Sequence, residues 1–258
     1  MRDSRLLRWG VGALGALVVL GVWQVAAAGP LAGSPLPTAG EAIGELAGLV
    51  VTLEMWSAVW DTVAMAVLGL VIATVAGVLL GVGIGVSPLA MHATRVPLEF
   101  LKPIPPIVIL PVVVLVLGPT AGMGVFLVFI GCFVSIVVQA SAGVFDTDPV
   151  ARATGQSYGL SRGEVLWSIV LPSALPYIGT AVRVAAPTAL IVAVVAGLIG
   201  GGPGLGQSLV QTQIAGNQPR LFAYVLVLGL LGLIVQGVSQ WGERRLLHWH
   251  PQYRKQVV

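Results

Sequence analysis

Charged residues are scarce in this sequence. Asp, Glu, Lys and Arg make up 9% of its 258 residues, against about 25% in an average soluble domain, and the mean hydropathy is +0.97. This deficit excludes an ordinary water-soluble domain. The charges flank the apolar stretches and do not form one basic face, so the formal net charge of +3 does not indicate a nucleic-acid-binding protein. The sequence therefore predicts an integral membrane protein.

Cysteine and clustered metal ligands are also nearly missing. Cys132 is the single cysteine, which excludes an intrachain disulfide, and its apolar neighbours predict a small buried side chain. His248 and His250 flank Trp249, but a metal site needs more ligands than these, so we interpret the group as part of an interfacial aromatic belt. The apolar stretches contain neither a nucleophile with a base nor a cluster of metal ligands, so we expect no enzyme activity and no bound metal.

A nucleotide-binding loop is absent as well. The pattern G-x-x-x-x-G-K-[ST], whose backbone N–H groups and lysine hold the phosphates of ATP, does not occur. The segment GGGPGLG at 200–206 lacks the lysine, and its glycines and proline are typical of a turn. We therefore expect the chain to bind no cofactor of its own.

Long apolar stretches dominate the rest of the sequence. Several reach or exceed the about 20 residues that cross a hydrocarbon core of about 30 Å as a helix, and they lack the alternating pattern of a membrane β-barrel. The expected fold class is an all-α polytopic membrane protein with about six transmembrane helices. The predicted spans cover residues 7–28, 56–86, 105–117, 125–144, 174–199 and 222–246.

The first three spans have unusual surroundings. Arg2, Arg5 and Arg8 resemble the basic region of a cleaved signal peptide, but the following apolar run is longer than a signal core, so we favour a retained first span. Glu41 and Glu45 lie four residues apart among apolar residues before the second span, which is typical of a short interfacial helix. The third span is short, and its prolines predict a kinked or broken helix.

The basic residues predict how the chain is oriented. In a six-span arrangement, one side of the membrane holds Arg2, Arg5, Arg8, Arg95, Lys102, Arg152, Arg162, Arg244, Arg245, Arg254 and Lys255. Arg220 alone falls in an opposite loop, and Arg183 lies within a span. By the positive-inside rule, both termini and the loop at 146–172 face the cytoplasm. The expected parts are an N-terminal span with an extracellular interfacial segment (1–55), a membrane core (56–246) and a cytoplasmic tail (247–258).

The loop at 146–172 is the most polar internal stretch, and its first half predicts a capped helix. Asp148 before Pro149 is a favourable N-cap and first-turn pair, because the N–H that proline lacks has no helical partner there. Gly159 is suited to the left-handed residue that ends such a helix. The expected helix is about ten residues long.

The second half of this loop predicts another capped helix. Ser161 and Glu164 have the capping-box spacing S-x-x-E ahead of an apolar run, and Pro172 is expected to end this second helix. A rigid loop of this kind could dock a partner, or it could be a well-capped connection without one. The spacing alone favours neither.

The same loop resembles the cytoplasmic signature of binding-protein-dependent ABC importer permeases. That signature reads E-A-A, three residues, G, nine residues, I, one residue, L-P. Its second half is matched by Gly159, Ile169, Leu171 and Pro172. The segments LKPIPPIVILPVVVL, SALPYIGTAVRVA and GPGLGQSL are similar to parts of the nitrate, sulfonate and taurine permease subfamily, in the same order. The resemblance covers about residues 56–249.

The first half of the signature departs from this pattern. Ala153, Thr154 and Gly155 align with E-A-A, so the glutamate that in the family helps to anchor the loop to the ATPase is absent. Either neighbouring residues make this contact, or coupling is weaker or uses a divergent ATPase. The coupling residues implied by the resemblance are Arg152, Ala153, Thr154, Gly155, Gln156, Gly159, Ser161, Arg162, Glu164, Ile169, Leu171 and Pro172.

The resemblance implies a permease subunit of an ATP-driven importer in a bacterial cytoplasmic membrane. The implied partners are a cytoplasmic ATPase dimer carrying ATP and Mg, an extracytoplasmic solute-binding protein, membrane lipid and a second permease copy. A homodimer is expected, because one short chain holds no second domain. The implied solute is nitrate, a sulfonate, taurine or a related small organic compound. The alternative is a channel-like or scaffold membrane protein that is not coupled to an ATPase.

Polar residues and prolines within the spans are candidates for the solute path or its gate. A charge near a span end can be solvated or can reach the interface, and we favour this explanation for Arg183. Hydroxyl and amide side chains can line a path or pack between helices. The prolines of the third span can form a gate or a structural kink. The candidates are Asp61, Pro105, Pro106, Pro111, Ser135, Gln139 and Arg183.

Overall fold

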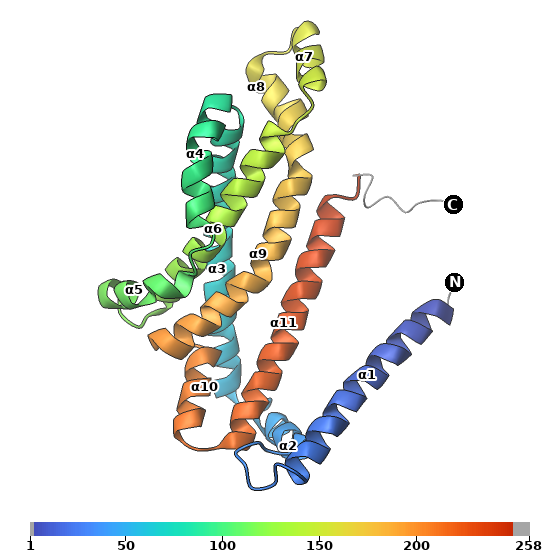
Figure 1. The fold of residues 1–258 in the computed structure, drawn as a ribbon, viewed down its shortest axis with the longest axis vertical. Helices are drawn as coiled ribbons and strands as arrows, with labels where there is room; N and C mark the ends of the chain where they lie inside the picture. Colours follow the sequence, from blue (N-terminus) through green and yellow to red (C-terminus); the bar gives the residue numbers. More distant parts are fainter. Residues whose placement is uncertain (1–2, 250–258) are drawn as a thin grey trace. The chain divides into compact units, whose positions relative to one another are not determined.

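The computed structural model describes the backbone of residues 3–249, and their side chains apart from those of residues 3–9 and 13. Over this range the chain is helical and contains no strand, which confirms the expected all-α fold (Figure 1). The α-helices are α1 (Asp3–Ala28), α2 (Ala39–Leu49), α3 (Leu53–Gly85), α4 (Pro88–Leu101), α5 (Leu110–Leu117), α6 (Ala121–Phe145), α7 (Pro149–Ser157), α8 (Arg162–Val165), α9 (Leu171–Gly200), α10 (Leu205–Ile214) and α11 (Gln218–Leu246). A 3₁₀ helix, η1 (Pro106–Ile109), precedes α5, and a π-helical turn, η2 (Leu166–Val170), joins α8 to α9.

Five helical stretches in the described part of the chain are long and apolar enough to cross a membrane. They are Gly10–Ala28, Leu53–Gly85, Ala121–Phe145, Arg162–Ile214 and Gln218–Leu246. A further crossing is formed if α4 and the following η1–α5 segment count as one broken span, with a bend of 76° between them. The expected count of about six and the expected break in the third span are therefore consistent with the structure.

The extent of this broken span differs from the prediction. The predicted third span begins at residue 105, whereas in the structure the helical segment before the break, α4, already contains Arg95 and Glu99. Arg95 and Glu99 are neighbours on one helical face, and their side chains form an ion pair of 3.1 Å. Because these two charges pair within the helix, they do not interrupt it, and the break comes only after Leu101.

The chain divides into two compact units, of which the first comprises Met1–Ser57 and Ser208–Leu230. In this unit, the loop after α1 is held by hydrogen bonds from Trp23 Nε1 to the Pro37 carbonyl, 3.0 Å, and from the Gly40 N–H to Gln24 Oε1, 3.1 Å. Helix α2 begins with a capping box between Thr38 and Glu41. The short helix expected around Glu41 is therefore confirmed.

The second unit, Ala58–Gln207 with Leu231–Val258, contains a close contact between α3 and α6. Small residues recur every fourth position on one face of α3, namely Gly69, Ala73, Gly77, Gly81 and Gly85. A Cβ atom on Gly69 would lie 2.6 Å from the side chain of Val128, and one on Gly81 would lie 2.8 Å from the Val137 carbonyl oxygen. Small residues at this spacing let helix backbones approach closely in a membrane, where apolar burial does not drive helices together.

Helix α9 packs against α6 through a second row of small residues (Figure 1). Ala181, Ala185, Ala189 and Ala193 are spaced by four residues, and all are buried in one apolar cluster with Cys132. The Cys132 thiol lies 3.6 Å from the Ala185 carbonyl oxygen and the residue is 1% exposed, so the expected small buried side chain is confirmed.

The glycine-rich segment after α9 forms a tight turn, as its composition predicts. Gly201 and Gly204 have φ values of +71° and +115°, which glycine adopts without strain. The Leu205 N–H donates to Thr62 Oγ1 at 2.9 Å, and Thr62 is fully buried on α3. The segment that follows was expected to lead directly into the last span, whereas the structure inserts helix α10 before α11.

Candidate functional site

The loop between α6 and α9 forms the helix predicted for its first half. Asp148 is the N-cap of α7, and its Oδ1 accepts a hydrogen bond from the Val150 N–H at 2.8 Å. Gly159 has a φ of +87°, and the N–H groups of Gly159 and Leu160 bond the carbonyls of Gln156 and Gly155 at 2.9 and 3.1 Å. This pair of bonds is a Schellman motif, so the predicted start and end of the helix are both confirmed.

The predicted capping box at the start of α8 is also present. The Ser161 N–H donates to Glu164 Oε2 at 2.7 Å, and the Glu164 N–H donates to Ser161 Oγ at 3.3 Å. Helix continues from Arg162 to Gly200, well beyond the about 20 residues that cross a bilayer, so we treat this exposed first turn as lying outside the hydrocarbon. The backbone bond from Ser161, and then its side-chain bond, lower the pKa of the Glu164 carboxyl.

Pro172 does not end the second helix, contrary to the prediction. After α8 the backbone forms the π-helical turn η2, and α9 then begins at Leu171 with Pro172 in its first turn. A proline is tolerated in a first turn because its missing N–H and its ring do not disturb a preceding α-helical bond. The π-helical turn thus lets the helix continue through a residue that would break a regular α-helix.

Two signature positions form the interior of this loop. Gly155 on α7 is buried, and a Cβ atom there would lie 2.7 Å from Ile169 Cδ1 and 3.4 Å from Leu160 Cδ1. Beneath them Val144, Val165 and other apolar residues form a small core. The loop is therefore a packed two-helix structure, in which Gly155 allows α7 to lie close to the chain around Ile169.

Most of the remaining coupling candidates are exposed. Ala153, Thr154, Gln156 and Arg162 are exposed, as are Ser161 and Glu164 of the capping box. Arg152 is half-buried and its Nη2 donates to the Val144 carbonyl at the end of α6, so its guanidinium is directed into the loop. Arg152 is therefore a poor substitute for the missing glutamate.

Two aromatic residues on this loop were not predicted as functional. Tyr158 is 86% exposed and Trp167 is 73% exposed, although both belong to a packed loop. Large exposed aromatic side chains are typical anchors in protein interfaces. Their position inside the most polar stretch of the sequence was the signal that could have marked them as exposed residues.

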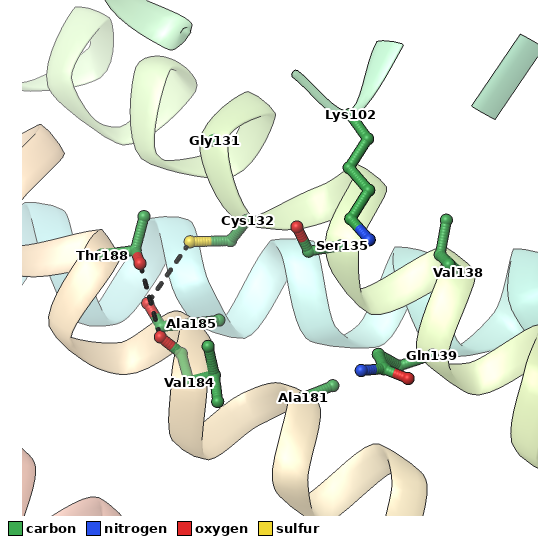
Figure 2. Close-up of a pocket in the computed structure, with 10 residues that line it drawn as sticks. All are labelled: Lys102, Gly131, Cys132, Ser135, Val138, Gln139, Ala181, Val184, Ala185 and Thr188. Carbon is green, nitrogen blue, oxygen red and sulfur yellow. Dashed lines mark hydrogen bonds between the residues drawn. The ribbon is translucent and has the colours of Figure 1, made fainter. Parts of the chain in front are cut away.

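A cavity of about 250 Å³ lies among the end of α4, α6 and α9 (Figure 2). Two predicted path residues, Ser135 and Gln139, line it, and Lys102 and Thr188 complete its polar part. The latter two were missed. The sequence signal for Lys102 was a single basic residue next to a proline-rich break. It was not used, because the segment before the third span was interpreted as lying outside the membrane.

The other path candidates have different surroundings. Asp61 is half-buried on α3 and does not line this cavity. The prolines form the break, with Pro105 preceding η1, Pro106 beginning it and Pro111 in the first turn of α5. A Cβ atom on Gly131 would lie 2.9 Å from Pro106 Cγ, so the break is packed against α6.

Arg183 is held by an ion pair that the sequence analysis did not anticipate. Its Nε lies 2.8 Å from Glu243 Oε2 on α11, although the N–H is not aligned for a hydrogen bond. Thr180, one turn earlier on α9, donates to Glu243 Oε1 at 3.0 Å. The structure therefore connects α9 to α11 through this charge and does not place Arg183 among the residues lining the α4–α6–α9 cavity.

Within residues 3–249, no three His, Cys, Asp or Glu side chains are grouped to hold a metal ion. His248 meets the Trp249 ring edge-on, with the ring centroids 5.2 Å apart. His250, Arg254 and Lys255 lie outside the described residues, as does most of the predicted tail.

Comparison with known proteins finds a transporter family and several permease proteins. Residues 73–248 match the family described as "Binding-protein-dependent transport system inner membrane component". A probable ABC transporter permease protein of Brucella melitensis biotype 1 is 28% identical over 151 residues, which are 58% of this chain and 61% of that protein. The taurine transport system permease protein of Escherichia coli strain K12 is 30% identical over 169 residues, which are 64% of this chain and 60% of that protein. The match thus spans about three-fifths of the length of these relatives.

Solved structures share the fold. A chain of the MetNI methionine ABC transporter in an inward-facing conformation has a TM-score of 0.64 at 20% identity, covering 74% of this chain and 96% of that chain. The family match extends from within α3 to the residues just after α11 and therefore includes the loop between α6 and α9 and the cavity. This chain belongs to the binding-protein-dependent inner membrane components of ABC transporters, the permease family that its sequence resembles.

Proposed function

We propose that this chain is the transmembrane permease subunit of an ATP-driven importer that receives a small solute from an extracytoplasmic binding protein. In this proposal two cytoplasmic ATPase subunits bind ATP and Mg, and the chain itself is not catalytic. A second copy of the chain completes the translocation path. The complex lies in a bacterial cytoplasmic membrane with both termini in the cytoplasm, and the solute is a nitrate, sulfonate, taurine or similar small compound.

The α7–α8 loop is the observation that carries this proposal. Capping at both helices and the Gly155–Ile169 contact give the loop its own small core, so its exposed side has a fixed shape. A rigid loop can pass a movement from a bound ATPase to α6 and α9, which it joins directly.

The same loop supports an altered contact with the ATPase. The family's glutamate is replaced by Ala153, and Arg152 is engaged with the Val144 carbonyl. Tyr158 and Trp167 offer large exposed surfaces instead, and aromatic residues of this kind frequently dominate binding energy. We therefore expect these two residues, and not a salt bridge, to anchor the ATPase.

The test is co-expression of this chain with the ATPase encoded nearest to its gene. The complex is purified in lipid nanodiscs, and ATP turnover is measured with and without the neighbouring binding protein. Stable association, with turnover that rises when loaded binding protein is added, is the expected result. If a folded chain binds no ATPase, the importer proposal fails, and a channel or scaffold becomes the better explanation.

Two tryptophan variants test the loop contact. Trp167→Ala is expected to weaken ATPase binding by about 30-fold, since a buried interface anchor contributes about 2 kcal/mol. Trp60→Ala is the matched control, because Trp60 is 71% exposed but lies on α3, away from the loop. Equal loss in both variants would contradict the assignment of Trp167 to the interface.

A further inference from the structure

Lys102 places a positive charge at the break of a bent pair of helices. It follows the last residue of α4, and the chain bends by 76° before it continues as η1 and α5. The Lys102 ammonium forms no ion pair or hydrogen bond with any side chain in the described part of the structure. The Lys102 side chain is exposed, so its charge is free to meet a solute, and breaks in membrane helices are frequent sites of solute binding. Lys102 thus has the position of a ligand-binding group.

The cavity next to Lys102 contains further hydrogen-bonding groups without partners. Figure 2 shows the Lys102 side chain extending from the end of α4 toward the part of α6 that carries Ser135, with Gln139 one turn further along α6. Neither Ser135 nor Gln139 uses its side chain in a hydrogen bond to another described residue. The Thr188 hydroxyl donates to the Val184 carbonyl at 3.3 Å. Three free donor groups, from Lys102, Ser135 and Gln139, therefore face one space.

The charged group lining this cavity favours a negatively charged ligand over a positively charged one. No Asp or Glu is among the described residues that line it, and Lys102 is the one charged group there. A cation would be repelled by Lys102, whereas an oxyanion would form charge-assisted hydrogen bonds with the ammonium. The remaining lining is made of small and aliphatic residues such as Ala181 and Val184, which suits a small organic group.

We infer that this cavity is a binding site for a small oxyanion, with Lys102 binding the acidic group and Ser135 and Gln139 donating hydrogen bonds to it. A carboxylate, a sulfonate or nitrate fits this chemistry. An amino group on the same molecule finds no carboxylate partner in the cavity, so a simple sulfonate binds more tightly than the matching amino-sulfonate. The inference rests on the proposed function in one respect, namely that a cavity within an importer permease lies on the route of the solute.

The experiment measures equilibrium binding of radiolabelled ethanesulfonate to the full chain in lipid nanodiscs, with and without its ATPase. Unlabelled nitrate, taurine and ethylammonium serve as competitors. Saturable binding is expected, with competition by nitrate, weaker competition by taurine and none by ethylammonium. Absence of saturable ethanesulfonate binding at millimolar concentration, or competition by ethylammonium equal to that by nitrate, would overturn the assignment.

Variants separate a binding role from a structural one. Lys102→Met is expected to weaken ethanesulfonate binding about tenfold or more, and Gln139→Leu to weaken it about fivefold. Lys102→Arg keeps the charge and should bind within about threefold of the original chain. Arg95→Met is the matched control, because it removes a positive charge two turns earlier on α4, and Arg95 does not line this cavity.

Thermal unfolding of each variant accompanies the binding measurement. A Lys102→Met variant that unfolds normally but binds ethanesulfonate as tightly as the original chain would refute the site. If Lys102→Met fails to fold, the comparison of Gln139→Leu with the original chain decides the question. Lysine-dependent binding without ATPase association would leave this site in place and remove the importer proposal, whereas ATPase coupling without anion binding would do the reverse.

Discussion

The ion pair between Arg183 and Glu243 allows a quantitative test of how α9 and α11 are held together. Glu243 is 6% exposed, Arg183 is 32% exposed, and the two charged groups approach to 2.8 Å. Unit charges about 4 Å apart attract by about 4 kcal/mol at an effective dielectric constant of about 20. Desolvation of both groups offsets much of this, and the partial exposure of Arg183 reduces it further, so we expect a net coupling of about 1–2 kcal/mol.

The perturbation is the double-mutant cycle Arg183→Met, Glu243→Gln and both together. Arg183→Met should destabilise the chain by about 2–3 kcal/mol, because it leaves a buried carboxylate with only Thr180 as a hydrogen-bond partner. Glu243→Gln should cost about 1–2 kcal/mol, because the partly exposed guanidinium can still be hydrated. The double variant should then cost less than the sum of the single changes by about 1–2 kcal/mol.

The assay is equilibrium unfolding in mixed micelles by SDS titration, followed by tryptophan fluorescence. Thr180→Val provides a further check, because it removes the hydroxyl donor and leaves both charges. Strict additivity of Arg183→Met and Glu243→Gln would refute the reasoning, since it would mean that the two groups do not stabilise one another in the folded chain.

Three further substitutions, the first with a matched control, test local features. Gly206→Ala should destabilise the second unit by about 3 kcal/mol or more, because its Cβ would lie 2.6 Å from the Leu198 backbone nitrogen, whereas Gly83→Ala meets nothing within 4 Å and should unfold like the original chain in thermal scans. Gly159→Ala should cost about 1–2 kcal/mol at its positive φ, and amide exchange should accelerate in α7 but not in α3. Ser161→Ala should remove about 1 kcal/mol of capping energy and accelerate exchange in α8 alone.

Local chemistry explains which parts of the site could be predicted from the sequence. The caps of α7 and α8 depend on residues two to four positions apart, so Asp148, Gly159 and the Ser161–Glu164 pair were recognisable from their spacing. Pro172 was misjudged because its usual effect assumes a regular α-helix, and the sequence carries no simple signal for a π-helical turn.

Long-range features were the ones that sequence reasoning missed. Arg183 and Glu243 lie 60 positions apart, and nothing in either neighbourhood points to the other. Lys102 lines one cavity with Ser135 and Gln139 because α4 packs against α6, and the spacing of residues along the sequence does not show this contact. The four-residue spacing of small residues from Gly69 to Gly85 is a signal for a helix contact that the sequence analysis did not use.

The glycines of α3 have a mechanical consequence. Sliding α3 along α6 by one residue would bring Leu70, Val78 and Val82 to places where a single methyl group already meets backbone or side-chain atoms within 3 Å. The two helices therefore fit together in one register, and a displacement of α3 moves α6 with it. Helices α9 and α11 are joined instead by the side chains of Arg183 and Glu243, which can separate without a backbone clash. We therefore expect α9 and α11 to move relative to one another at this side-chain contact, whereas α3 and α6 keep their relative position.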